Sequence, residues 1–74
     1  MLMLMDELKI YFLKNKFQEL EKWISRKFSP EILRIKDVTD LGEDNDYFEI
    51  TVEYSSPYWL VGLGRTMEMV NLLY

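Results

Sequence analysis

The chain has 74 residues, with 9 Lys and Arg against 13 Asp and Glu, a net charge of −4 at pH 7, and neither Cys nor His. These counts exclude a disulfide framework and a zinc centre built from thiolate or imidazole ligands, and they leave no His to act as a base near neutral pH. A hydrophobic fraction of 49% indicates one small folded domain over residues 1–74. Because a core of this size gives limited stability, we expect a partner to supplement it.

The first predicted element is a helix over residues 6–28, a stretch without Gly or Pro. Apolar residues recur there at steps of three and four, the spacing of one helix face. Acidic residues begin the segment and basic residues end it, as the helix dipole favours. We expect the following stripe to face the core: Ile10, Leu13, Phe17, Leu20, Ile24 and Phe28.

The opposite side of this predicted helix is also apolar. It carries Met5, Leu8, Phe12 and Trp23, bordered by Lys9, Lys16 and Lys27, with Glu19 and Arg26 beside them. A helix with two apolar sides is buried on both or meets a partner on the second. Two interpretations stay open: Phe12 and Trp23 anchor a protein–protein interface, or the N-terminal residues or the C-terminal helix cover them within the monomer. Because bases stack on aromatic rings and phosphates attract Lys and Arg, a nucleic-acid-associated regulator is the alternative function.

The middle of the chain predicts an antiparallel β-hairpin. Pro30 disfavours helical geometry at Ser29 and so ends the first helix. Residues 32–38 read as a strand, and residues 47–54 alternate cleanly between apolar and polar side chains. In the second strand we expect one face to be buried, namely Phe48, Ile50, Val52 and Tyr54.

The connection between these strands is strongly acidic. Residues 37–46 contain five carboxylates, namely Asp37, Asp40, Glu43, Asp44 and Asp46. The spacing of an EF-hand calcium loop is absent, so we expect a solvated loop, with a weak cation site as the alternative. Residues 1–36 hold eight basic and five acidic residues, whereas residues 37–74 hold one and eight, so the charge of the two halves differs in sign.

A second helix is predicted over residues 58–74, after a Ser56–Pro57 start signal. Its core face is formed by Trp59, Leu63, Met67, Val70 and Tyr74. A rival interpretation makes "YWLVG" a third strand with a turn at "GLGR". Further apolar residues lie off the core face, which favours a homodimer or packing against another chain; they are Val61, Met69, Leu72 and Leu73.

The sequence therefore predicts an α+β fold with two layers in the order α-β-β-α, an antiparallel β-hairpin packed against two helices. The predicted function is a non-enzymatic protein–protein interaction, adaptor or regulatory module that associates with itself or another protein. No Ser has a His to activate it, and no cofactor or metal is expected. No apolar run reaches membrane-spanning length, and the expected location is the cytoplasm. The predicted interface consists of Leu8, Phe12, Trp23, Lys16, Arg26, Lys27, Met69, Leu72 and Leu73.

The runs "KFSPEILRIKDVTD", "DYFEITVEYSS" and "GRTMEMVNLLY" resemble BolA-type proteins, whose αββα arrangement is akin to KH-like folds. The resemblance covers roughly residues 18–74 and implies a small BolA-like or KH-like protein as a second alternative. The His residues that the family is implied to use in sharing iron–sulfur clusters with glutaredoxins have no counterpart here, because the chain contains no His.

Overall fold

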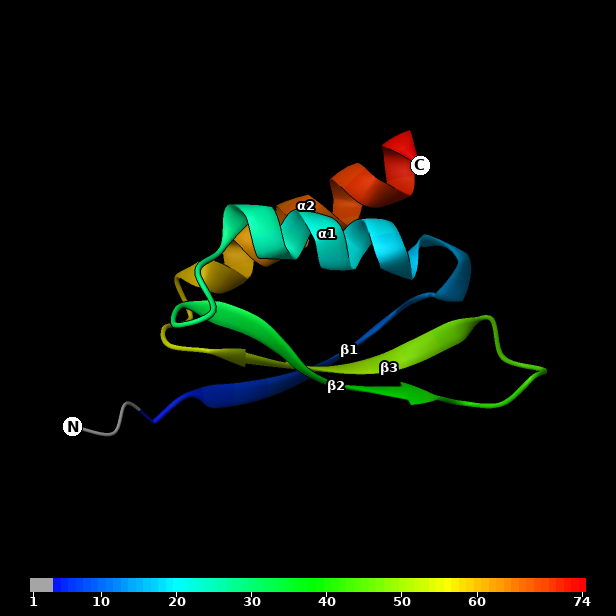
Figure 1. Cartoon of the computed structure of the whole chain (residues 1–74), viewed down its shortest axis with the longest axis horizontal. Helices are drawn as coiled ribbons and strands as arrows, with labels where there is room; N and C mark the ends of the chain where they lie inside the picture. Colours follow the sequence, from blue (N-terminus) through cyan, green and yellow to red (C-terminus); the bar gives the residue numbers. More distant parts are fainter. Residues whose placement is uncertain (1–3) are drawn as a thin grey trace.

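The computed structural model describes residues 4–74, which form a two-layer α+β fold. The elements follow in the order β1 (Asp6–Leu13), a 3-10 turn η1 (Lys14–Lys16), α1 (Phe17–Lys27), β2 (Leu33–Asp40), β3 (Tyr47–Tyr54) and α2 (Trp59–Leu73). The strands form an antiparallel sheet in the order β1-β3-β2, and both helices cover the same face of it (Figure 1). The predicted fold class, the two helices and the antiparallel hairpin of β2 and β3 are confirmed.

The predicted helix over residues 6–28 is wrong in its first third, because residues 6–13 form strand β1. Leu8, Ile10 and Phe12 alternate with polar residues and pair with Val52, Ile50 and Phe48 of β3. A hairpin alone leaves one edge of β3 open, and β1 satisfies the backbone hydrogen bonds of that edge. The order of elements is therefore β-α-β-β-α, and α1 begins only at Phe17.

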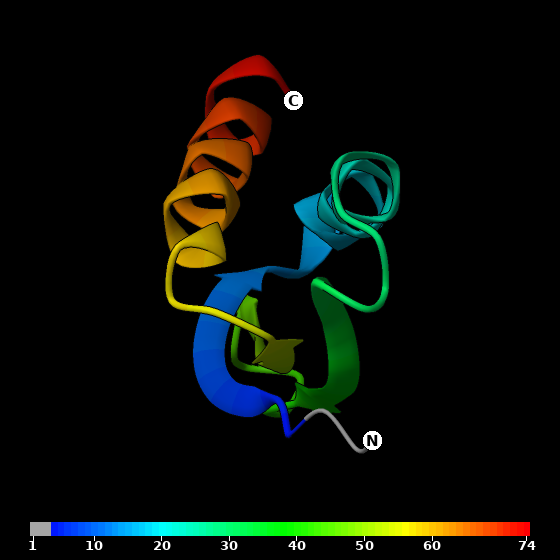
Figure 2. The same ribbon diagram turned by 90° about the vertical axis from the view of Figure 1, so that its left-hand side faces the viewer.

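The core lies between the helices and the sheet, as the end-on view shows (Figure 2). Its helix side confirms the second part of the predicted stripe, since Leu20, Ile24 and Phe28 are buried. Its sheet side confirms the inward face of β3, where Ile50 and Val52 are fully covered. The remaining buried apolar residues are Phe12, Leu33, Leu63 and Val70.

Helix α2 is confirmed over Trp59–Leu73, so the rival interpretation of "YWLVG" as a strand is wrong. The chain enters the helix through a turn in which the Ser56 hydroxyl accepts a hydrogen bond from the Tyr58 amide at 3.3 Å. Thr66 is fully buried, and its hydroxyl donates to the Gly62 carbonyl at 2.8 Å. The only polar side chain buried completely within residues 4–74 is thus hydrogen-bonded.

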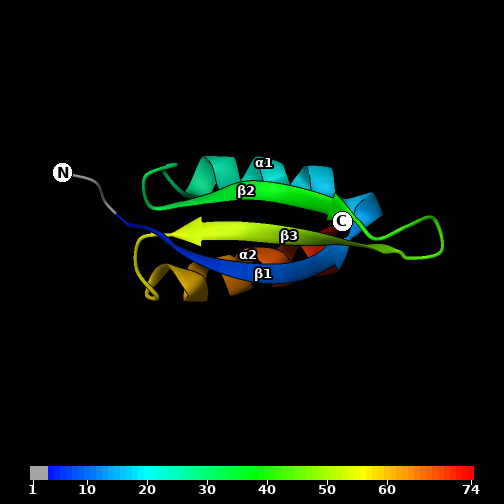
Figure 3. The same ribbon diagram turned by 90° about the horizontal axis from the view of Figure 1, so that it is seen from below.

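Figure 3 views the sheet from the side away from the helices. The side chains on this face are mainly polar, and ion pairs connect neighbouring strands. Lys9 pairs with Glu49 at 3.6 Å, Arg34 pairs with Glu53 at 2.9 Å, and Lys36 pairs with Glu7. The hydrogen bond to Glu7 and its charge raise the pKa of Lys36. Because these groups pair within the sheet and stay in water, this face offers a partner little apolar surface.

The two outer strands differ in how regularly they pair with β3. The register between β2 and β3 shifts between Ile35 and Asp37, so β2 contains an irregularity of the β-bulge kind. Bulges and charged side chains on outer strands disfavour the addition of a further strand. Strand β2 therefore offers a poor edge for pairing with a strand of another molecule.

Candidate protein-binding surface

The predicted interface divides into residues that the structure brings together and two that it does not. Phe12 is only 2% exposed and lies in the core, while Leu8 is 37% exposed near the start of the same strand. The expectation that both share a helix face with Trp23 is wrong, because they belong to β1, whereas Trp23 belongs to α1. Phe12 points into the core because its backbone pairs with Phe48 on the inward face of β3.

Trp23 and its basic neighbours form one cluster on α1, as the sequence predicted. The Arg26 guanidinium lies 5.5 Å and the Lys27 ammonium 5.9 Å from the centre of the Trp23 ring, within range of cation–π attraction. Trp23 is half-buried against the core. Lys16 donates to the Asn71 carbonyl at 2.9 Å, which joins this side of α1 to the end of α2. The C-terminal helix therefore covers this side in part, as one of the two open interpretations held.

The end of α2 stays uncovered. Leu72 and Leu73 are 75% and 70% exposed, and Met69 is half-buried against the core. In Figure 1 the last turns of α2 rise away from the sheet. At the other end of the helix, Val61 is 63% exposed, and Tyr58, the residue before the helix begins, is 73% exposed. Apolar side chains thus remain in water at both ends of α2.

A pocket of about 570 Å³ lies where the end of α1 meets the start of α2. Its apolar lining is formed by Phe28, Tyr58, Trp59, Val61 and Gly62, and its cations are Lys27 and Arg65. Of these residues, the sequence placed Lys27 in the predicted interface and Val61 among the apolar residues that favour packing against another chain. The segment "PYWLVGLGR" is the sequence feature that indicates this pocket, because aromatic residues follow a helix start and a Gly allows close packing.

Gly62 has a specific reason to be glycine. A Cβ atom at this position would lie 3.0 Å from the tip of the Phe28 ring, so the glycine lets α1 and α2 meet closely at the pocket. Gly64 differs, because nothing lies within 4 Å of the position its Cβ would take. Close approach of the two helices therefore explains Gly62 but not Gly64.

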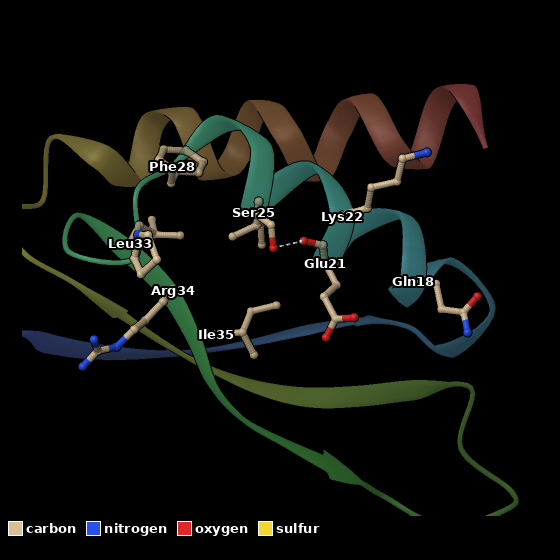
Figure 4. Close-up of a pocket in the computed structure, with 10 residues that line it drawn as sticks. Gln18, Glu21, Lys22, Ser25, Phe28, Leu33, Arg34 and Ile35 are labelled. Atoms are coloured by element: carbon tan, nitrogen blue, oxygen red, sulfur yellow. Dashed lines mark hydrogen bonds between the residues drawn. The ribbon is translucent and has the colours of Figure 1, made fainter.

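A second hollow, of about 400 Å³, lies between α1 and β2 (Figure 4). Glu21, Lys22 and Ser25 line it from the helix, and Leu33, Arg34 and Ile35 line it from the strand. The Ser25 hydroxyl donates to the Glu21 carbonyl at 3.0 Å, and Arg34 is held by Glu53. The Ser25 hydroxyl is therefore bound to a backbone carbonyl, and the Arg34 guanidinium is bound to a carboxylate of the neighbouring strand.

The acidic loop is organised by a lysine. Lys14 lies 2.6 Å from Asp40, and the Gly42 amide donates to the same carboxylate at 2.9 Å. These two hydrogen bonds hold the pKa of Asp40 below its usual value. Gly42 adopts a positive φ of 110°, which favours glycine at this turn. Within residues 4–74 no three acidic side chains come close enough together to hold a metal ion.

The predicted basic ridge for nucleic acid does not form as one surface. Lys9 lies on the outward face of the sheet beside Glu49, whereas Lys27 lies on the helix layer. Arg26, Lys27 and Arg65 make no ion pair with any residue in the described range 4–74. These three cations gather around Trp23 and the pocket.

Comparison of the chain with models of protein families, with curated proteins and with solved structures finds no match. The resemblance to BolA-type proteins gains no support from these comparisons. Among residues 4–74, no helix has both the length and the apolar character needed to cross a membrane.

Proposed function

We propose that this protein is a non-enzymatic protein–protein interaction module. Its binding surface, which we call the α2 surface, is the outward side of α2 together with the pocket at the start of that helix. The observation that carries the proposal is the exposure of Val61 beside an apolar pocket, together with the exposure of Leu72 and Leu73 at the other end of the same helix. Exposed apolar groups with a polar rim are typical of protein-binding sites.

The composition of the α2 surface supports this proposal. Trp, Tyr and Arg are the residues most enriched among those that dominate binding energy, and Trp59, Tyr58 and Arg65 line the pocket. The sheet face offers no comparable area, because its charges pair with one another. A partner that covers the α2 surface gains the free energy of apolar burial, about 25 cal/mol for each Å² removed from water.

A regulatory or adaptor role without catalysis is consistent with the hydroxyl and carboxylate geometry. Ser25 donates to a backbone carbonyl, and Asp40 is neutralised by Lys14. Glu7, Glu49 and Glu53 on the sheet are likewise engaged by lysine or arginine. The expected cytoplasmic location stays a prediction from the sequence.

Binding of a nucleic acid is a second candidate, favoured by Arg26 and Lys27 near Trp23 and by Arg65 at the pocket, none of which has an ion pair within residues 4–74. Bases stack on exposed aromatic rings, and arginine and lysine attract phosphate. Against it, the chain has a net charge of −4, and Trp23 is half-buried. The salt dependence of binding separates the two candidates, because phosphate contacts weaken steeply as salt increases.

The proposed function is tested with Val61→Asp and Leu72→Asp, which place a charge on the α2 surface. Leu41→Asp is the matched control, since Leu41 is 40% exposed in the distant hairpin loop. We expect the labelled wild-type chain to sediment as an assembly, alone or in cell extract, and the two α2 variants to lose it. Sedimentation as a free chain of 9.0 kDa under both conditions, or assembly unaffected by both variants, contradicts the proposal.

A further inference from the structure

We propose that the occupant of the α2 surface is a second copy of this chain, whose α2 lies antiparallel to the first about a two-fold axis. This inference rests on the proposed function and gives it a specific partner and geometry. The axis passes beside the helix between Thr66 and Met67. The proposal is carried by the arrangement of residues along α2, by one unexplained glycine and by the shape of the pocket.

The exposed stripe of α2 has the same order of residue types from either end, namely apolar, charged, charged and apolar. Val61, Arg65, Glu68 and Leu72 follow one another at steps of four, three and four residues, which places them on one helix face. All four are exposed. The stripe has an apolar residue at each end and one charge of each sign in the middle, so its centre falls between residues 66 and 67.

An antiparallel pair about that centre matches each residue with a complementary one. Val61 lies opposite the partner's Leu72, and Arg65 lies opposite the partner's Glu68. Each contact occurs twice, because a two-fold interface uses the same surface on both copies. A parallel pair instead sets Arg65 near the partner's Arg65 and Glu68 near the partner's Glu68, which is repulsive. Charge complementarity therefore selects the antiparallel arrangement.

Gly64 supplies an independent argument. It lies three residues after Val61 and four before Glu68, on the flank of the same stripe. A glycine in a helix interior destabilises the helix by about 1 kcal/mol relative to alanine. Gly62 is explained by the Phe28 ring, but no atom within 4 Å explains Gly64. Close approach of a second helix backbone gives this glycine a structural reason.

The pocket receives the apolar end of the other helix. In the antiparallel pair, the partner's Leu72 and Leu73 come level with Val61 and the residue before it. Their side of the helix is the one that faces the pocket, whose wall contains Val61, Gly62 and Arg65. Each copy thus fills the pocket of the other, and the exposed leucines at the end of α2 are buried.

The symmetry of the pair gives a direct test by charge exchange. Arg65→Glu alone, or Glu68→Arg alone, sets like charges opposite each other twice in the dimer. The double variant Arg65→Glu/Glu68→Arg restores both pairs, because each copy then carries both changes. An unrelated partner protein retains its own charges, so the double variant does not restore its binding. Lys22→Glu, on the side of α1 that faces β2, is the control for a change of the same sign.

The readout is the sedimentation equilibrium of the purified chain, with helix content checked by circular dichroism. We expect a mass of about 18 kDa, twice the chain mass of 9.0 kDa. Each single variant should raise the dissociation constant about tenfold, and the double variant should return it toward the wild-type value. A purified chain that stays at 9.0 kDa, or a double variant as weak as the singles, overturns the antiparallel pair. If Val61→Asp still abolishes binding to another protein, the proposed function stands while this inference fails.

Discussion

Gly62 lies directly against the ring of Phe28, so that an added Cβ would come within 3.0 Å of the ring tip. This contact joins the start of α2 to the end of α1 at the floor of the pocket. Gly64 lies about half a helical turn further along, and a Cβ atom added there would have no neighbour within 4 Å. Two glycines separated by one residue therefore have different roles, which substitution by alanine can separate.

We expect Gly64→Ala to stabilise the isolated subunit by about 0.5–1 kcal/mol, because alanine favours the helix and meets no neighbour. Gly62→Ala should lack this gain, because the Phe28 ring must shift. The measurement is urea unfolding of both variants in an Arg65→Glu background, which weakens association, at protein concentrations where that background is monomeric. Equal gains at the two positions would show that the Phe28 contact is unimportant.

In the dimer, Gly64→Ala should have the opposite effect. The new methyl group holds the two α2 helices apart, so the dissociation constant should rise while the subunit becomes more stable. Sedimentation of Gly64→Ala at several concentrations measures the association separately from folding. Unchanged association would remove the glycine argument for the antiparallel pair.

Phe12→Ala should destabilise the fold by about 3–5 kcal/mol, because Phe12 is 2% exposed and its removal leaves a cavity. Leu8→Ala is the matched substitution on the same strand face, and its effect should be smaller because Leu8 is 37% exposed. Denaturant unfolding monitored by tryptophan fluorescence measures both. A Phe12→Ala variant of wild-type stability is incompatible with a buried β1.

The stability of the hairpin loop should depend on acid through Asp40. Its pKa is lowered by hydrogen bonds from Lys14 and the Gly42 amide, so the folded state favours the ionised carboxylate. The resulting stabilisation is present above the ordinary pKa of 3.8 and is lost as the pH falls through the lower folded value. Asp40→Asn should therefore flatten the fall in unfolding midpoint below that pH.

The control for this prediction is Asp44→Asn in the same loop. Asp44 has no ion-pair partner among residues 4–74, so its substitution should leave the pH dependence of the unfolding midpoint unchanged. If both variants behave alike, the Lys14–Asp40 pair contributes nothing specific to stability.

Self-association should survive high salt. The contact between Val61 and the partner's Leu72 is apolar, whereas screening at 1 M salt shortens the Debye length to about 3 Å and weakens only the charge pairs. We expect the dissociation constant to change by less than about tenfold between 0.1 and 1 M salt. Binding through phosphate contacts should instead fall by orders of magnitude, which would favour the nucleic-acid candidate.

The sequence allowed much of the fold to be predicted, because β3 and α2 follow the periods of a strand and a helix. Tyr47–Tyr54 alternates strictly, and the apolar stripe of α2 follows helical spacing after the start signal at Ser56 and Pro57. The error at residues 6–13 arose because Ile10 and Leu13 fit a helix continuing into Phe17, while Leu8, Ile10 and Phe12 fit a strand equally well. Only pairing with the free edge of β3, a long-range contact, decides between the two periods.

The candidate surface was less predictable for the same reason. Leu72 and Leu73 lie off the core face of α2 and were identified from spacing, but the pocket joins residues that are distant in sequence. Phe28 and Trp59 both fit a core stripe, and nothing local indicates that their edges border a hollow. The position of such a hollow depends on how closely the two helices meet, which Gly62 and Phe28 determine.

The central claim is tested most directly by cross-linking, since the chain contains no Cys of its own. Val61→Cys carrying an affinity tag is mixed with untagged Leu72→Cys and treated with a short bifunctional thiol reagent. In the antiparallel pair these two positions face each other, whereas either position lies roughly 16 Å along the helix from its own copy in the partner. We predict a cross-linked species in the mixture and little in either variant alone. Cross-linking of each variant with itself, or none in the mixture, would contradict the account.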